Sequence, residues 1–175
     1  MLSQRGLFVI AMIGPVGSGK THIAKMLARQ LGARRLNTDA VRVALRRKHE
    51  SESQAIAISH RRQERLLARG HSLILDYDHV NPARRGELQE RLRPFEARAY
   101  FVRIETPERL ILARLKRKRY TGRDLFKDAE EAIRIYHMRK RFHERPQRFS
   151  PDFAIDNTKP IEPQIEKIAE TIKGL

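Results

Sequence analysis

The 175-residue sequence predicts an α/β fold: a three-layer α/β/α sandwich around a mostly parallel five-stranded sheet. Three observations predict this fold. The run at residues 7–13 is nearly all apolar, as a strand buried on both faces should be. A glycine-rich loop and an amphipathic helix follow that run directly. Further strand-like runs then alternate with helical stretches, which is typical of a parallel sheet with crossover helices.

Turn and cap residues mark the elements of the first half of the chain. The first predicted helix carries an apolar stripe that includes Ile23 and Leu27, and it ends at Gly32. Asn81 followed by Pro82 indicates a helix start, with Asn as the cap and Pro in the first turn. Strands are predicted at residues 7–13, 34–38 and 72–76, and helices at 20–31, 39–47, 52–69 and 81–93.

The second half of the chain repeats these signals. Thr106 followed by Pro107 again combines a helix cap with a proline, and residues 120–123 form a break. Strands are predicted at 97–104 and 153–156, and helices at 106–119, 124–144 and 161–173. Because no linker divides the chain, we expect one domain over residues 1–175.

Composition narrows the class of protein. The chain has no cysteine, which excludes a disulfide framework, a thiol nucleophile and a Cys-ligated zinc site. No apolar run reaches the roughly 20 residues of a membrane span. The run at residues 7–13 leads into glycines rather than a cleavage site, so no signal peptide is predicted. We therefore expect a cytoplasmic protein with no membrane partner.

Net charge predicts an acidic partner. The chain holds 37 Lys and Arg against 21 Asp and Glu, a formal charge of +16. Phosphates, nucleic acid or an anionic surface would each complement such a surplus. The excess is concentrated in two stretches, with ten basic against four acidic residues over 34–69 and fifteen against seven over 103–148.

A phosphate-binding loop is indicated at residues 14–21, Gly-Pro-Val-Gly-Ser-Gly-Lys-Thr, which match G-x-x-x-x-G-K-[ST] in full. The motif follows a buried strand and opens a helix, as its mechanism requires. The glycines let backbone N–H groups point at phosphate oxygens, and the helix N-terminus adds its positive dipole end. The nucleotide-binding candidates are Gly14, Gly17, Ser18, Gly19, Lys20 and Thr21.

Two side chains of this loop have further expected roles. Lys20 would bridge the outer phosphates of ATP, and the Thr21 hydroxyl would ligate Mg²⁺. The alternative is an ordinary glycine turn capped by Ser18. The flanking strand and helix favour the phosphate loop.

With this loop and the elements after it, the chain resembles a P-loop kinase. The resemblance is to the group that includes polynucleotide 5′-kinase domains, gluconate kinase, chloramphenicol phosphotransferase and zeta toxins, and it spans almost the whole chain. It implies a P-loop NTPase fold with a helical lid over about residues 109–145, and ATP with Mg²⁺ as phosphate donor.

Asp39-Ala-Val-Arg42 resembles the D-x-x-R element of these kinases. In them the Asp accepts a proton from the substrate hydroxyl, and the Arg contacts the acceptor. Residues three apart at a helix start share a face, so a carboxylate and a cation would meet at the acceptor. The alternative is that Thr38 or Asp39 only caps a helix.

Two further parts of the resemblance lie later in the chain. In these kinases an Asp at the end of a strand holds Mg²⁺ through water, and Asp76 resembles it. Asp78 and His79 then follow at positions where Thr and Asn are usual in the group. That departure indicates a different acceptor or a solvated loop. Arg114 and Arg117 share a face of the lid helix, where arginines would neutralise charge on the transferring group.

The sequence thus predicts an ATP- and Mg²⁺-dependent phosphotransferase. The basic surplus favours a polynucleotide 5′-hydroxyl as acceptor, because Lys and Arg release counterions from phosphates. The alternatives are a small-molecule acceptor (nucleoside, sugar acid, aminosugar nucleotide or antibiotic) and a nucleic-acid-binding NTPase. The predicted catalytic residues are Asp39, Lys20, Arg42, Arg114 and Arg117, the metal ligands are Thr21 and Asp76, and His137 and His143 are expected to be solvated or half-packed.

Overall fold

The computed structural model describes residues 6–145 and 149–174, whose strands form one five-stranded sheet in the order β2-β3-β1-β4-β5. All of its pairings are parallel, which confirms the predicted α/β sandwich. The central strand β1 pairs with β3 on one side and β4 on the other, so the loop after β1 opens at the middle of the carboxyl edge. The strands are β1 (Phe8–Ile13), β2 (Arg34–Leu36), β3 (Leu73–Leu75), β4 (Arg98–Glu105) and β5 (Phe153–Asp156).

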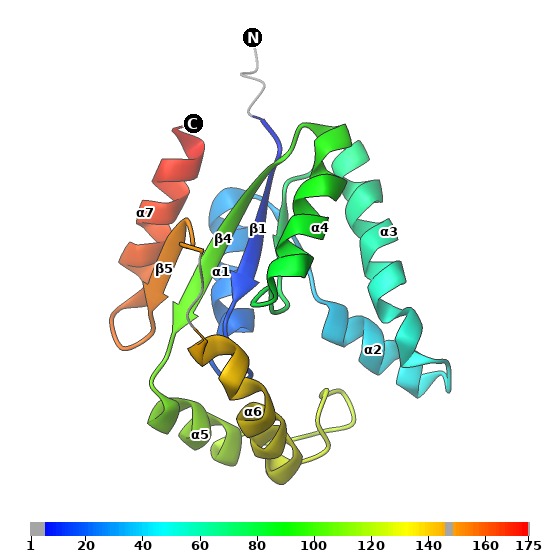
Figure 1. The fold of residues 1–175 in the computed structure, drawn as a ribbon, viewed down its shortest axis with the longest axis vertical. Coiled ribbons are helices and arrows are strands. Elements are labelled where there is room, and N and C mark those ends of the chain that lie inside the picture. Colours follow the sequence, from blue (N-terminus) through cyan, green and yellow to red (C-terminus); the bar gives the residue numbers. More distant parts are fainter. Residues whose placement is uncertain (1–5, 146–148, 175) are drawn as a thin grey trace.

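Helices cover both faces of the sheet, as Figure 1 shows. Helices α1 and α7 pack on one face, and α3 and α4 pack on the other. At the end toward which the arrows of β1 and β4 point, α5 and α6 pack against each other. The helices are α1 (Lys20–Leu31), α2 (Thr38–Arg47), α3 (Ala55–Ala68), α4 (Pro82–Leu92), α5 (Glu108–Arg117), α6 (Ala129–Glu144) and α7 (Ile161–Lys173), with short 3-10 turns η1 (Glu52–Gln54) and η2 (Arg93–Phe95).

Two apolar cores, one on each face of the sheet, hold the layers together. Because side chains alternate along a strand, Ile10 and Met12 of β1 join the core under α1 and α7, whereas Val9 and Ala11 join the core under α3 and α4. All four are fully buried. The apolar run of β1 is therefore explained by burial on both faces, and it fixes the loop that follows.

Four predicted elements differ from the structure by two or more residues at an end. The helix predicted at 106–119 spans Glu108–Arg117, and Thr106 does not cap it, because Pro107 is at the N-cap position. The helix predicted at 124–144 begins only at Ala129, because the Asp128 side chain caps it by accepting from the Glu131 N–H. Residues 118–128 instead form an irregular segment that we call the lid loop. The helix predicted at 52–69 is split into η1 and α3, and the strand predicted at 34–38 stops at Leu36.

Among the helices of the described residues, none combines the length and the apolar character that crossing a bilayer requires.

Candidate active site

The loop between β1 and α1 has the backbone of an anion-binding site. Gly17 and Gly19 adopt φ values of +80° and +96°, which favour glycine. A Cβ at Gly17 would lie 3.0 Å from Leu115, and a Cβ at Gly19 would lie 2.9 Å from Asn157 Nδ2. No side chain caps α1, so its first-turn N–H groups keep their capacity to bind phosphate oxygens.

The Lys20 ammonium group bridges the beginning of this loop. Its Nζ donates to the carbonyl oxygens of Gly14 at 2.6 Å and Pro15 at 2.8 Å. Burial lowers the pKa of Lys20, while the negative charges of Asp78, Asp76 and Asp39 act in the opposite direction. The Lys20 ammonium group therefore lies within the field of three carboxylates and beside the backbone N–H groups of the loop.

Asp76, directly after β3, meets Thr21 as the metal prediction requires. Thr21 Oγ1 donates to Asp76 Oδ1 at 3.1 Å. The second oxygen, Oδ2, accepts from Asn37 at 2.8 Å and forms an ion pair with Arg35. The hydroxyl and the carboxylate form the kind of oxygen pair that holds Mg²⁺ together with substrate phosphates, so the residues present fit that ion.

Asp78 and His79 do not lie in a solvated loop. Asp78 Oδ1 accepts from the Gly14 N–H at 3.1 Å, and Oδ2 lies 3.0 Å from His143 Nε2. Burial raises the pKa of Asp78, but the hydrogen bond from His143 and the charge of Lys20 outweigh it and lower the pKa below its usual value. Asp78 thus links α6 to the first glycine of the loop.

His79 has a structural environment. It is 1% exposed, and its Nδ1 lies 3.0 Å from the Tyr77 carbonyl and 3.3 Å from the Met12 carbonyl. Burial lowers the pKa of His79 to about 4, so the ring is neutral at pH 7. A neutral ring with its proton on Nδ1 donates to these carbonyls and packs the base of the loop.

Asp39 and Arg42 lie together at the start of α2. Asn37, rather than Thr38 or Asp39, caps this helix by accepting from the Ala40 N–H at 2.9 Å. Asp39 is therefore not used as a cap, and its Oδ1 accepts from Arg42 Nη1 at 2.9 Å. Both side chains line the cavity that contains Lys20.

The two predicted lid arginines have different surroundings. Arg114 Nη1 donates to the Ser18 carbonyl at 3.3 Å, and the same oxygen accepts from Asn157 Nδ2 at 2.6 Å. Arg114 and Arg117 are both exposed, and neither lines the cavity with Lys20, contrary to the sequence prediction. Sequence reasoning did not select the cations that do line it, which are Lys118 and Arg123 on the lid loop and Arg139 on α6. Only the packing of the lid loop and α6 brings them to one cavity.

The cavity that joins these groups, here called the main cavity, has a volume of about 600 Å³. It is bounded by the phosphate loop, α2, α3, the segment after β3, α4 and the lid loop. The lid loop is tied to α2, because Arg46 Nη1 donates to the Leu125 carbonyl at 3.2 Å. Arg46 is itself held by Glu52 at 2.7 Å.

The comparisons agree with this architecture. The sequence profile of a family described as AAA domain matches residues 9–146. No curated protein sequence matches the chain significantly.

Several solved structures with a similar fold are named as kinases, and their sequence identity to this chain is low. A candidate kinase from Chloroflexus aurantiacus is 16% identical with a TM-score of 0.69, covering 96% of this chain and 97% of that one. The APS kinase of Mycobacterium tuberculosis, in complex with AMPPNP and APS, is 20% identical with a TM-score of 0.62, covering 97% and 98%. A gluconokinase from Sinorhizobium meliloti is 16% identical with a TM-score of 0.64, covering 97% and 94%. The neighbours establish the fold and are consistent with a P-loop phosphotransferase.

Proposed function

This chain belongs to the AAA domain family, and from that premise we propose that it is an ATP- and Mg²⁺-dependent kinase that phosphorylates a hydroxyl group of a small molecule. The observation that carries the proposal is the main cavity, in which Lys20 and Asp39 line the same space. In this proposal residues 1–175 act as one cytoplasmic kinase domain, with residues 109–145 as the lid.

The donor end of the reaction would be held by the phosphate loop. Its N–H groups and Lys20 would bind the β- and γ-phosphates of ATP. Thr21 and Asp76 would hold Mg²⁺, which when bound neutralises charge on the phosphates. Asn157 and Arg114, both bonded to the Ser18 carbonyl beside Gly19, would flank the nucleoside end.

Asp39 would act as the general base. It takes the proton of the acceptor hydroxyl as the hydroxyl oxygen attacks the γ-phosphorus, the bond from that phosphorus to the ADP oxygen breaks, and ADP leaves. Arg42, held by Asp39 at 2.9 Å, would position the acceptor. Arg139 and Lys118 line the cavity from the lid and would stabilise charge on the transferring phosphoryl group.

A small acceptor is favoured over a polynucleotide end by the size of the cavity and by the similar structures. The Arg46–Leu125 hydrogen bond also ties the lid loop to α2 beside the cavity. A volume of about 600 Å³ is in the range of small-molecule sites. APS kinase and gluconokinase, whose structures share this fold, are named for small-molecule substrates.

A polynucleotide 5′-hydroxyl remains the second candidate acceptor because of the charge. The chain has a formal charge of +16, which exceeds what one nucleotide requires.

Transfer of labelled γ-phosphate tests the proposal. Wild-type protein with ATP and Mg²⁺ is offered a panel of small hydroxyl compounds and a 5′-hydroxyl oligonucleotide. We expect label on a small compound, lost in Asp39→Asn and retained in Glu50→Gln, a matched carboxylate-to-amide change at an exposed position. Labelled oligonucleotide would support the second candidate, and ATP consumption with no labelled acceptor would indicate an NTPase.

A further inference from the structure

The charged side chains of the main cavity fall into two groups. At the phosphate-loop end, the carboxylates are satisfied within the protein: Asp76 binds Arg35, Asp78 binds His143, and Asp39 binds Arg42. At the end between α3 and α4, three charged side chains of α4 line the cavity. Within residues 6–145 and 149–174, the side chains of these three, Arg84, Glu87 and Arg91, form no hydrogen bond or ion pair. Arg84 and Glu87 are exposed at the mouth of the cavity, and Arg91 is half-buried.

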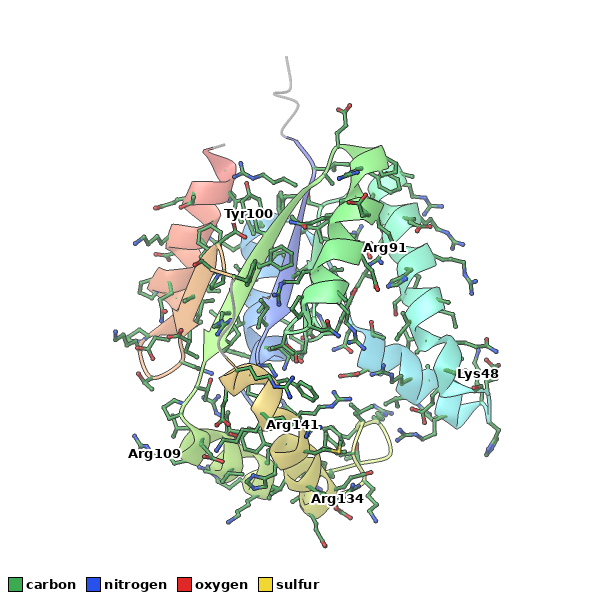
Figure 2. The ribbon with its side chains drawn as sticks, viewed as in Figure 1. Lys48, Arg91, Tyr100, Arg109, Arg134 and Arg141 are labelled. Atoms are coloured by element: carbon green, nitrogen blue, oxygen red, sulfur yellow. The ribbon has the colours of Figure 1, made fainter. Side chains whose placement is uncertain are left out.

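Arg84 and Arg91 lie on one face of α4, and the charges of both act on His60 of α3. Residues 84, 87 and 91 are three and seven positions apart, which places them on one side of a helix. Figure 2 labels Arg91 on the side of α4 toward α3. Burial lowers the pKa of His60 on α3, and the charges of Arg91 and Arg84 lower it further. Both arginines therefore lie near one histidine of the facing helix.

Buried polar atoms at this end also lack partners. Arg91 Nε is buried without a hydrogen-bond partner in the described part of the chain. On α3, Gln63 follows the cavity-lining Ser59 by one turn on the same buried stripe and is 1% exposed. Neither amide atom of Gln63 has a partner within the described residues, but Gln63 does not line the cavity. A buried donor such as Arg91 Nε is ordinarily paired, so at the cavity wall it indicates a place where a ligand supplies an acceptor.

We propose that Arg84 and Arg91 form a subsite for an oxyanion group of the acceptor: a carboxylate, sulfate or phosphate bound between α3 and α4. This inference rests on the proposed function, because it names the class of acceptor that the same cavity takes. A guanidinium fork binds such a group through two parallel N–H···O bonds.

The surrounding charges define the rest of the subsite. Glu87 also lines the cavity, and Glu64 lies near enough to raise the pKa of His60. With His60 neutral at pH 7, two guanidinium groups face one lining carboxylate, so an anion is favoured. Glu87 would accept a hydrogen bond from a hydroxyl group on the same acceptor. The acceptor is thus a hydroxyl compound that carries an oxyanion apart from the hydroxyl that is phosphorylated.

Binding of inorganic phosphate to the nucleotide-loaded protein tests this subsite. Saturating AMPPNP with Mg²⁺ fills the phosphate loop and the γ-phosphate position, and phosphate is then titrated by calorimetry. We expect the dissociation constant to rise by about tenfold in Arg91→Gln and in Arg84→Gln. Arg93→Gln is the matched control, because Arg93 follows α4, is exposed and pairs with Glu90 outside the cavity.

The outcomes separate the inference from the proposed function. Equal phosphate affinity in wild type, Arg84→Gln and Arg91→Gln overturns the subsite, and so does an equal loss in Arg93→Gln. Absence of AMPPNP binding contradicts the proposed function, whereas the effect of Arg91 on phosphate binding is still measured. Arg91→Lys, which keeps the charge but not the fork, is expected to bind phosphate with intermediate affinity if it folds like the wild type by thermal unfolding.

Sulfate and acetate titrations identify the kind of oxyanion. Sulfate and phosphate share a tetrahedral shape, and acetate presents a planar carboxylate. The anion whose affinity falls most in Arg91→Gln indicates the acceptor group. If none of the three anions depends on Arg91, the subsite is excluded.

Discussion

The two ends of the main cavity differ in how their charges are neutralised. At the phosphate-loop end, Lys20 donates to two carbonyls, and Asp76 and Asp78 each have cationic or hydrogen-bonded partners. At the α4 end, Arg84 and Arg91 have no such partner in the described residues. The charges of the first end are therefore paired within the protein itself. The second end keeps unpaired donors that an acceptor would satisfy.

This difference indicates which end of the cavity is preorganised and which end would select the acceptor. Internal pairing holds catalytic groups in place before substrate arrives, which lowers the reorganisation needed for transfer. Unpaired arginines leave binding free energy to be gained only with the correct acceptor. Substitutions at each end should therefore have different effects, and the following predictions run from the largest to the smallest.

Removing the loop cation should have the largest effect. In Lys20→Met, the charge proposed to face the outer phosphates is lost, so we expect transfer to fall by about 10³-fold or more and nucleotide affinity to fall with it. Transfer assays and AMPPNP titrations measure both. Lys25→Met, an exposed lysine on the same helix, is the control. Wild-type transfer by Lys20→Met would contradict the assignment of this end as the donor site.

Asp39→Asn should separate catalysis from binding at the same end. The amide cannot accept the hydroxyl proton, so we expect kcat to fall by about 10²–10³-fold. AMPPNP affinity should remain within about twofold of wild type, because Asp39 contacts Arg42 rather than the loop. A fall in nucleotide affinity as large as the fall in kcat would show that Asp39 supports the loop instead.

Lowering the pH should reduce the stability of the folded protein, because His79 is buried in its neutral form beneath the phosphate loop. Its pKa is about 4 in the folded protein against 6.5 when unperturbed, so between these values the unfolded chain binds a proton that the folded chain does not. The contribution of His79 to the free energy of unfolding is therefore fully present above pH 6.5, and it decreases as the pH falls toward 4.

The expected change in unfolding free energy from His79 is about 2 kcal/mol between pH 7 and pH 5. Urea unfolding at the two pH values measures it. His79→Gln removes the titrating group and should reduce the pH dependence by that amount. A smaller slope remains, because the pKa of His60 is also lowered by burial. An unchanged slope in His79→Gln would contradict the assignment.

Releasing the lid loop from α2 should have the smallest effect on the free energy of unfolding. Arg46→Ala removes the hydrogen bond to Leu125 and the exposed ion pair with Glu52, so we expect less than about 1 kcal/mol of lost stability. The KM of the acceptor should rise by about threefold while kcat changes less, because the lid loop is no longer tied to α2. Arg47→Ala is the exposed neighbouring control, and equal KM values in both variants would mean that the contact does not close the cavity.

The order of elements was predictable, whereas several boundaries depended on side-chain capping. Apolar strands and cap residues placed every strand and nearly every helix. The predicted start of α6 was wrong, because the helical pattern continues upstream of Asp128. The Asp128 side chain caps the helix by accepting from the Glu131 N–H. The end of β2 depends in the same way on Asn37, which caps α2.

Local spacing also predicted the groups that meet within one element or one motif. Lys20 and Thr21 follow from the phosphate-loop pattern, and Asp39 and Arg42 are three apart at a helix start. The Thr21–Asp76 contact was predictable because the carboxyl ends of adjacent parallel strands meet at one edge. These features depend on short-range geometry that the chain encodes directly.

Other features depend on contacts between distant residues. The pairing of His143 with Asp78 depends on where α6 lies, and the burial of His79 depends on how the segment after β3 meets β1. Arg117 lies at the exposed end of α5. The unpaired Arg91 depends on the space between α3 and α4. By itself the sequence determined the fold class and the phosphate loop, because these follow from periodicity and local spacing. Only the tertiary structure decided which charges are neutralised and which face the cavity, because pairing depends on distances between segments far apart in the chain.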